Sequence, residues 1–325
     1  MLNDSLETSG QIVQNREILR SSLATKVAKA GPSPERPINA LFWLEEGEIA
    51  RTKDQRTDML MRRSLSGQQS EDPDIALLRD LYDKKLPIPI LRSIAVRLVE
   101  KDFELERKLN IDELTGLFTR RFCIKAMEEL IESYLLGETD TAICFVDIDK
   151  IKEHNETEGY EFGTGAMQAV AYALQGTGNI AGRFYSGDED LVLMPGIIPT
   201  EIAGIMETVR TQRLPEAVER VKTEQKPNKR IGDLPVSFKY GFTSFSDTLE
   251  YFIENNIDVF ALDYSEMMAK FIDTTLDIVQ TYERLEKARS KNQAIADIEE
   301  GLKKQFDEKT ESLLKFCLKR KLINV

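Results

Sequence analysis

Apolar and polar residues follow the periods of both strands and helices in the middle of the chain, residues 110–275. Thr141–Ile148 is an almost continuous apolar run, which is typical of a strand buried on both faces. The expected strands are residues 141–148, 180–185, 191–194 and 235–245, and the expected helices are residues 163–174 and 249–270. This alternation predicts an α/β or α+β domain in which the two middle strands form a hairpin around a polar turn.

The regions on either side of this domain have different patterns. Residues 1–75 are polar and irregular apart from one apolar cluster, so either a small helical module or a disordered tail is expected there. Residues 76–109 read as a helical linker, and residues 276–325 are charged and amphipathic, which predicts one or two long helices. The domain therefore carries helical extensions at both ends.

A stripe of leucines runs along the helical linker. Leu91, Leu98 and Leu105 are spaced by seven residues, the repeat of a coiled coil. Such a stripe either forms a parallel dimer seam or packs within its own domain. We favour the seam and expect a homodimer.

Composition narrows the classes of function. The 325 residues include 44 Lys plus Arg against 56 Asp plus Glu, a formal charge of −12, which would repel a nucleic-acid backbone. The three cysteines, Cys123, Cys144 and Cys317, are far apart and form neither a disulfide framework nor a CxxC metal motif. No secretory signal and no apolar run of about 20 residues is present. We expect a cytoplasmic protein that neither spans a membrane nor binds nucleic acid.

Carboxylates mark two strand ends. Asp147 ends the buried strand, while Asp188 and Glu189 lie in the turn of the hairpin. If these strands are neighbours, the three carboxylates meet at one sheet edge and suit Mg²⁺, which binds few protein carboxylates and leaves other positions to phosphates. Gly187 would let backbone N–H groups approach a phosphate, and Lys152 would neutralise its charge. A solvated acidic hairpin is the alternative for either turn alone.

Four motifs in this order resemble those of GGDEF domains, the diguanylate cyclase family. The matching segments are 112–122 (DELTGLFTRRF), 147–155 (DIDKIKEHN), 186–190 (SGDED, where GGDEF would stand) and 236–245 (VSFKYGFTSF), with Ala269-Lys270 at the place of a closing AK. Together they cover residues 110–275, about half of the chain. The resemblance implies a palm-like nucleotide-cyclase sheet flanked by helices.

The resemblance also implies an activity and a set of site residues. Two subunits, each with one bound GTP, would face each other and form cyclic di-GMP. Asp147, Asp188 and Glu189 would be ligands of Mg²⁺ or Mn²⁺, with Asp188 and Glu189 also catalytic. The residues around the nucleotide would be Lys152, Asn155, Thr164, Ser186, Gly187 and Lys270.

Several positions depart from the family pattern. Thr164 replaces an Asp that accepts hydrogen bonds from guanine, so we expect weaker base selectivity and binding of ATP as well as GTP. Asp190 replaces the closing Phe, and Asp273-Thr274-Thr275 replaces a GRN that would supply a phosphate-binding Arg. The metal carboxylates are all present, whereas the base and phosphate contacts are eroded.

Two functions therefore remain open. One is a diguanylate cyclase-like enzyme with relaxed base choice, favoured by the three retained carboxylates. The other is a catalytically inactive, degenerate GGDEF domain that senses nucleotide or acts as a scaffold, with a protein partner at the terminal helices. Thr164, Asp190 and the missing Arg favour this second function.

Overall fold

The computed structural model describes residues 2–30, 46–66, 72–177, 179–185, 187–224, 235–290 and 308–323. Its contacts divide the chain into two compact units. We call Met1–Gly31 with Asp112–Val325 the sheet unit, and Pro32–Ile111 the helical unit. The first residues of the chain thus belong with the sheet and not with the helices that follow them.

The helical unit consists of α2 (Glu46–Leu65), α3 (Pro73–Asp83) and α4 (Ile88–Asn110). A cap starts α3, because the Asp72 side chain accepts hydrogen bonds from the backbone N–H groups of Asp74 and Ile75. The three helices share one apolar core, made of Leu60, Met61, Ile75, Leu78, Leu91, Ala95 and Val99. Burial of this core explains why such a polar segment is helical.

Most of the leucine stripe of α4 packs within the helical unit. Leu91 is 1% exposed in the core, and Leu98 packs against that core from its edge. Only Leu105 is exposed, at 47%. The first two leucines therefore pack inside their own unit, which was the alternative to a dimer seam.

A sheet of five strands, in the order β1-β3-β4-β2-β5, lies at the centre of the sheet unit. The strands are β1 (Phe118–Thr119), β2 (Thr141–Ile148), β3 (Ile180–Arg183), β4 (Glu189–Pro195) and β5 (Phe238–Ser244). β2 is antiparallel to both β4 and β5, β3 is antiparallel to β4, and β1 is parallel to β3. The predicted α/β class, the central strand and the hairpin are confirmed.

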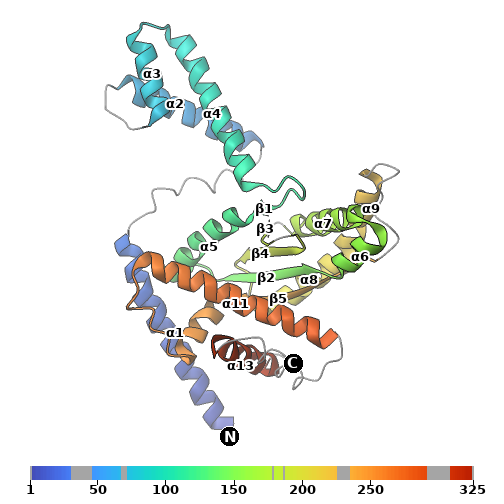
Figure 1. The fold of residues 1–325 in the computed structure, drawn as a ribbon. Coiled ribbons are helices and arrows are strands. Elements are labelled where there is room, and N and C mark those ends of the chain that lie inside the picture. The colour runs from blue at the N-terminus through green and yellow to red at the C-terminus, as the bar shows by residue number, and fades with distance from the viewer. Residues whose placement is uncertain are drawn as a thin grey trace. The chain divides into compact units, whose positions relative to one another are not determined.

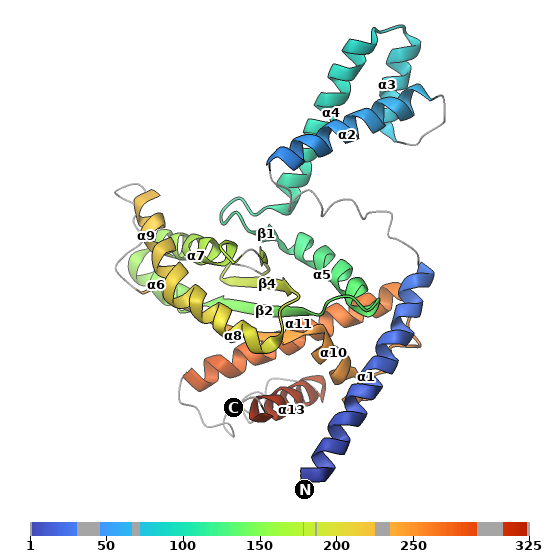
Figure 2. The same cartoon turned by 180° about the vertical axis from the view of Figure 1, so that it is seen from behind.

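Helices cover both faces of this sheet (Figures 1 and 2). One face packs against α7 (Tyr160–Gln175) and α8 (Pro199–Thr208), which continues through the π-helical segment η2 (Val209–Arg213) into α9 (Leu214–Glu224). The other face packs against α5 (Arg120–Leu135) and α11 (Tyr264–Ser290). Because β2 is buried on both faces, its residues are apolar except for Thr141 at its start and Asp147 next to its end.

The predicted helix over residues 249–270 is instead two helices, α10 (Phe245–Glu254) and α11. The chain turns where Asn256 adopts a positive φ of 50°, and the Asp258 side chain then accepts hydrogen bonds from the N–H groups of Phe260 and Ala261. These local bonds stop α10 and redirect the chain before α11 begins.

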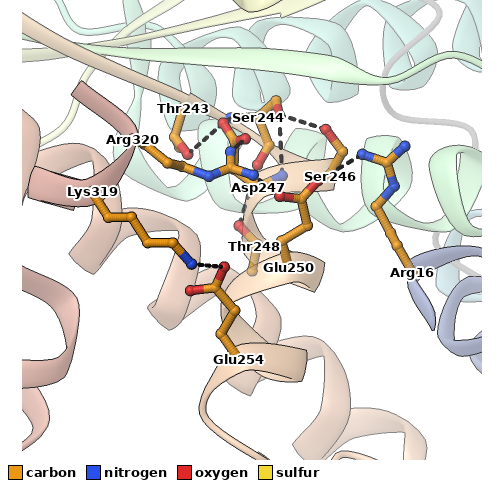
Figure 3. A network of polar contacts seen from close by, with 10 residues as sticks. All are labelled: Arg16, Thr243, Ser244, Ser246, Asp247, Thr248, Glu250, Glu254, Lys319 and Arg320. Carbon is orange, nitrogen blue, oxygen red and sulfur yellow. Dashed lines mark hydrogen bonds and ion pairs between the residues drawn. The ribbon is translucent and has the colours of Figure 1, made fainter. Parts of the chain in front are cut away.

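The terminal helices α1 (Leu2–Ala30) and α13 (Glu308–Ile323) both dock on α10 through charged side chains (Figure 3). Arg16 of α1 is 2.9 Å from the Glu250 carboxylate, and Arg320 of α13 pairs with both Glu250 and Asp247. α13 also packs along α11, and α1 also contacts α5. Among the helices described, none combines the length and the apolar composition that a bilayer span requires.

Candidate functional site

Three carboxylates meet where β2 ends and β4 begins. Asp147 and Glu189 are direct partners across the antiparallel pair, so their Cβ atoms lie on the same face about 4.5–5.5 Å apart. Asp188 precedes Glu189 in the turn, and its backbone carbonyl accepts a hydrogen bond of 2.9 Å from the Ile148 amide. The structure thus places Asp147, Asp188 and Glu189 together at one end of the neighbouring strands β2 and β4. We call this place the Asp147–Glu189 edge.

A lysine from α11 completes this group. The Nζ atom of Lys287 is 2.5 Å from Oδ2 of Asp147 and 3.2 Å from Oε1 of Glu283, one helical turn earlier. α11 reaches the sheet because Gly241 of β5 has no side chain: a Cβ atom there would lie 2.3 Å from the Glu283 backbone nitrogen. The glycine therefore sets the close approach that brings Lys287 to Asp147.

Burial makes the negative charges of this group unfavourable, so the group favours a bound cation. Burial raises the pKa of Asp147, and Lys287 only partly opposes this. Burial also raises the pKa of Glu189, assisted by the charges of Asp147 and Asp188, and burial raises the pKa of Glu283. Although burial opposes a charged Lys287, its bonds to Asp147 and Glu283 raise its pKa. The site would therefore gain from a further positive charge.

The donor set agrees with Mg²⁺ bound together with phosphates. Asp147 and Glu189 provide hard carboxylate oxygens on adjacent strands, and Mg²⁺ commonly takes one or two carboxylates while phosphates and water supply its other ligands. Within the described ranges, no group of three or more His, Cys, Asp or Glu side chains is arranged to hold a metal by itself. The residues therefore suit a metal ion that is bound jointly by the protein and a nucleotide. They do not suit a metal ion held by protein ligands alone.

The turn between β3 and β4 differs from the expected phosphate cradle. Gly187 has a positive φ of 130°, and its amide donates to the Tyr185 carbonyl at 2.8 Å. That N–H group is therefore engaged within the turn. Ser186, also expected near the nucleotide, lies outside the described residues. The Tyr185 hydroxyl accepts a hydrogen bond from Gln280 of α11, which ties the turn to that helix.

The residues predicted to contact the base lie on α6 (Ile151–Glu158) and α7. Oδ1 of Asn155 accepts a hydrogen bond from the Gly163 amide at 3.0 Å, so Asn155 lies beside Thr164. The Thr164 hydroxyl donates to the Tyr160 carbonyl at 3.2 Å, within its own helix. Lys152 is exposed on α6. Asn155 and Thr164 are thus brought together.

Lys270 is not brought to the carboxylates. It lies 17 residues before Lys287 on α11, which corresponds to about 25 Å along a helix axis. The resemblance pointed to Lys270 because Ala269-Lys270 stands at the place of the closing AK; Lys287 lies farther along the same helix, α11. A signal was nevertheless present: Ser290-Lys291-Asn292 follows Lys287 at the spacing at which GRN follows the family lysine.

Asp190, the residue that replaces the closing Phe, lies on the opposite face of the sheet. It is 4% exposed and pairs across the strands with Val146 and Arg183. Burial raises its pKa to about 8, although Arg183 opposes the shift. Arg183 itself is 3.2 Å from Asp112, which also accepts hydrogen bonds from Thr115. Burial therefore favours the neutral form of the Asp190 carboxyl near pH 7.

The sequence model of the family described as "Diguanylate cyclase, GGDEF domain" matches residues 109–248. The chain is 31% identical over 129 residues to the probable diguanylate cyclase DgcC of Escherichia coli, covering 37% of this chain and 34% of DgcC. It is 29% identical over 103 residues to the response regulator PleD of Caulobacter vibrioides, covering 30% of this chain and 22% of PleD. The chain thus spans about a third or less of these relatives.

Two solved structures to which the chain is similar are the following. The coiled coil and GGDEF domain of DgcB from Caulobacter crescentus, in complex with c-di-GMP, matches with 20% identity and a TM-score of 0.40, covering 56% of this chain and 96% of that one. The diguanylate cyclase SiaD from Pseudomonas aeruginosa, in complex with its activator SiaC, matches with 22% identity and a TM-score of 0.36, covering 70% and 79%.

Proposed function

We propose that the sheet unit, of which residues 109–248 match the GGDEF family model, binds GTP with Mg²⁺ or Mn²⁺ at the Asp147–Glu189 edge and converts two GTP molecules to cyclic di-GMP. One observation supports this above the others: two partly buried carboxylates on neighbouring strands face a lysine ammonium 2.5 Å from Asp147. Phosphoryl transfer needs this combination of metal-binding oxygens and a cation for the phosphates.

The carboxylates and the lysine of the Asp147–Glu189 edge would have separate roles in this reaction. Asp147, Asp188 and Glu189 would hold the metal, which would neutralise charge on the phosphates. Glu189 lies beside Asp147 and would also accept the proton of the attacking 3′-hydroxyl, while Asp188 would help to position the metal. Lys287 would contact the phosphates, the role that the family resemblance suggested for Lys270.

The base would lie near Asn155 and Thr164. Asn155 is held by the Gly163 amide, so its amide group has a defined orientation. Thr164 offers a hydroxyl in place of a carboxylate, and that hydroxyl is already bonded within its helix. We therefore propose binding of both GTP and ATP, with weak discrimination between them.

Cyclic di-GMP formation requires two sites to face each other, so the active form would be a homodimer in the cytoplasm, where GTP is available. The oxygen of one 3′-hydroxyl attacks the α-phosphorus of the other GTP, and pyrophosphate leaves. Leu105 and Leu109, which are 47% and 52% exposed near the end of α4, are the candidates for the contact between subunits.

A nucleotide-sensing scaffold is the second candidate, favoured by the engaged hydroxyl of Thr164 and by Asp190 in place of Phe. Incubation of purified protein with GTP, ATP or both, with Mg²⁺, followed by mass analysis of the products, separates the two. Cyclic di-GMP that disappears in Glu189→Gln supports the enzyme. Nucleotide binding without any cyclic product leaves the scaffold.

A further inference from the structure

The contact between Lys287 and Asp147 places a positive charge directly on a carboxylate that the proposed function assigns to a metal. The Asp147 side chain is 12% exposed, and the Lys287 side chain is 36% exposed. The ammonium lies 2.5 Å from Oδ2, in direct contact with this carboxylate. A metal ion bound to either oxygen of the same carboxylate would lie close to this ammonium and be repelled by it, so the two cations compete for Asp147.

We propose that Lys287 is the resident cation of Asp147, which a divalent metal ion must displace before it can bind. This inference rests on the proposed function, because it takes Asp147 as a metal ligand. Binding of the metal then breaks the ion pair between Lys287 and Asp147. It also frees the ammonium for another anion.

Glu283 is the positioning residue in this exchange. Its side chain is 5% exposed, its Oε1 atom is 3.2 Å from the Lys287 ammonium, and its backbone is fixed against Gly241. After displacement from Asp147 the ammonium therefore keeps one partner at the edge of the site. A triphosphate then supplies further oxygens to the same ammonium.

Metal and nucleotide should consequently help each other to bind. A metal alone must break the contact between Lys287 and Asp147 without replacement, whereas a nucleotide gives Lys287 a new anionic partner. By linkage, the metal must then tighten nucleotide binding by the same factor by which nucleotide tightens metal binding. Weak binding of metal alone is the distinctive expectation.

Mn²⁺ binding to the nucleotide-free full chain, followed by electron paramagnetic resonance, tests the exchange. Lys287→Gln should tighten Mn²⁺ binding by about tenfold or more, the equivalent of about 1.4 kcal/mol. Arg284→Gln is the matched control, since it removes a positive charge from the same helix but not the contact with Asp147; it should change affinity by about twofold at most. Lys287→Arg, which keeps the charge, should behave as wild type.

The outcomes separate this inference from the proposed function. Measurable Mn²⁺ binding that is equal in wild type and Lys287→Gln would overturn the exchange and leave the nucleotide site standing. Equal tightening by Lys287→Gln and Arg284→Gln would also overturn it, because the loss of any positive charge from this helix would then explain the tighter Mn²⁺ binding. If neither wild type nor Lys287→Gln binds Mn²⁺, and GTP with Mg²⁺ does not stabilise either protein, both proposals fail.

Wild-type protein offers a second test that does not depend on a variant folding. Mass spectrometry can follow acetylation of individual lysines by a small reagent, with and without Mg²⁺. Release from Asp147 should make Lys287 react several-fold faster when Mg²⁺ is added, while Lys315, exposed on α13, should not change. An unchanged rate at Lys287 at Mg²⁺ concentrations that stabilise the protein would contradict displacement.

Discussion

The replacement of Asp190 by Asn should change how the stability of the protein depends on pH. Asp190 is 4% exposed, and burial raises its pKa from an ordinary 3.8 to about 8. Between these two values the unfolded chain is ionised at Asp190 while the folded chain keeps the proton, so the folded state loses stability as pH rises. Asn is neutral at every pH and removes this effect.

The magnitude follows from the two pKa values. Each pH unit between them costs the folded wild type about 1.4 kcal/mol relative to a neutral side chain. Between about pH 4.5 and about pH 8 the free energy of unfolding of Asp190→Asn should therefore gain about 4 kcal/mol on that of wild type. Above the folded pKa the difference should level off, because the folded form then ionises too.

Urea denaturation of both proteins across this pH range measures the difference. Titrating groups that do not interact with Asp190 contribute equally to the two proteins and cancel. The Asn amide makes its own bonds, but these add an offset that does not depend on pH. If the two curves of unfolding free energy against pH run parallel, Asp190 is not a buried neutral acid, and the argument that burial raises its pKa is refuted.

Three further outcomes are expected. Gly241→Ala should destabilise the protein by about 1–3 kcal/mol in thermal denaturation, because the new Cβ would meet the backbone of α11 at 2.3 Å; Gly204→Ala, where a Cβ meets nothing within 4 Å, is the control and should be neutral or stabilising. Thr164→Asp should tighten GTP relative to ATP by about 1–3 kcal/mol in titration calorimetry, and an unchanged ratio would remove this residue from the base site. Glu250→Gln should weaken the bonds that Arg320 makes on α10 and speed hydrogen exchange in α13 and α1, whereas unchanged exchange would show that the network does not hold these helices.

Strong local patterns predicted the centre of the fold. The apolar run Thr141–Ile148 is β2, and the hairpin around the acidic turn is β3 with β4. The convergence of Asp147 and Glu189 followed from the assumption that these strands are neighbours, and the register pairs the two residues directly. Strand-end carboxylates could be placed because β pairing leaves few arrangements.

Long-range helix packing could not be read in the same way. Lys270 and Lys287 both lie on an amphipathic helix, and only the packing of α11 on Gly241 determines which lysine reaches the carboxylates. Likewise, the heptad spacing of Leu91 and Leu98 is the same for a dimer seam and for an internal core, and contacts with α2 and α3 decide between them. The docking of α1 on α10, 234 residues apart at Arg16 and Glu250, left no local signal.

Thermal stability in the presence of GTP and Mg²⁺ tests the central claim most directly. If the Asp147–Glu189 edge binds a metal–nucleotide complex, ligand at 100 times its Kd should add about 2.7 kcal/mol to the stability of wild type. The gain should require both GTP and Mg²⁺ and should vanish in Asp147→Asn and in Asp188→Ala. No stabilisation by any nucleotide, or an equal gain in those variants, would contradict a nucleotide site at this edge of the sheet.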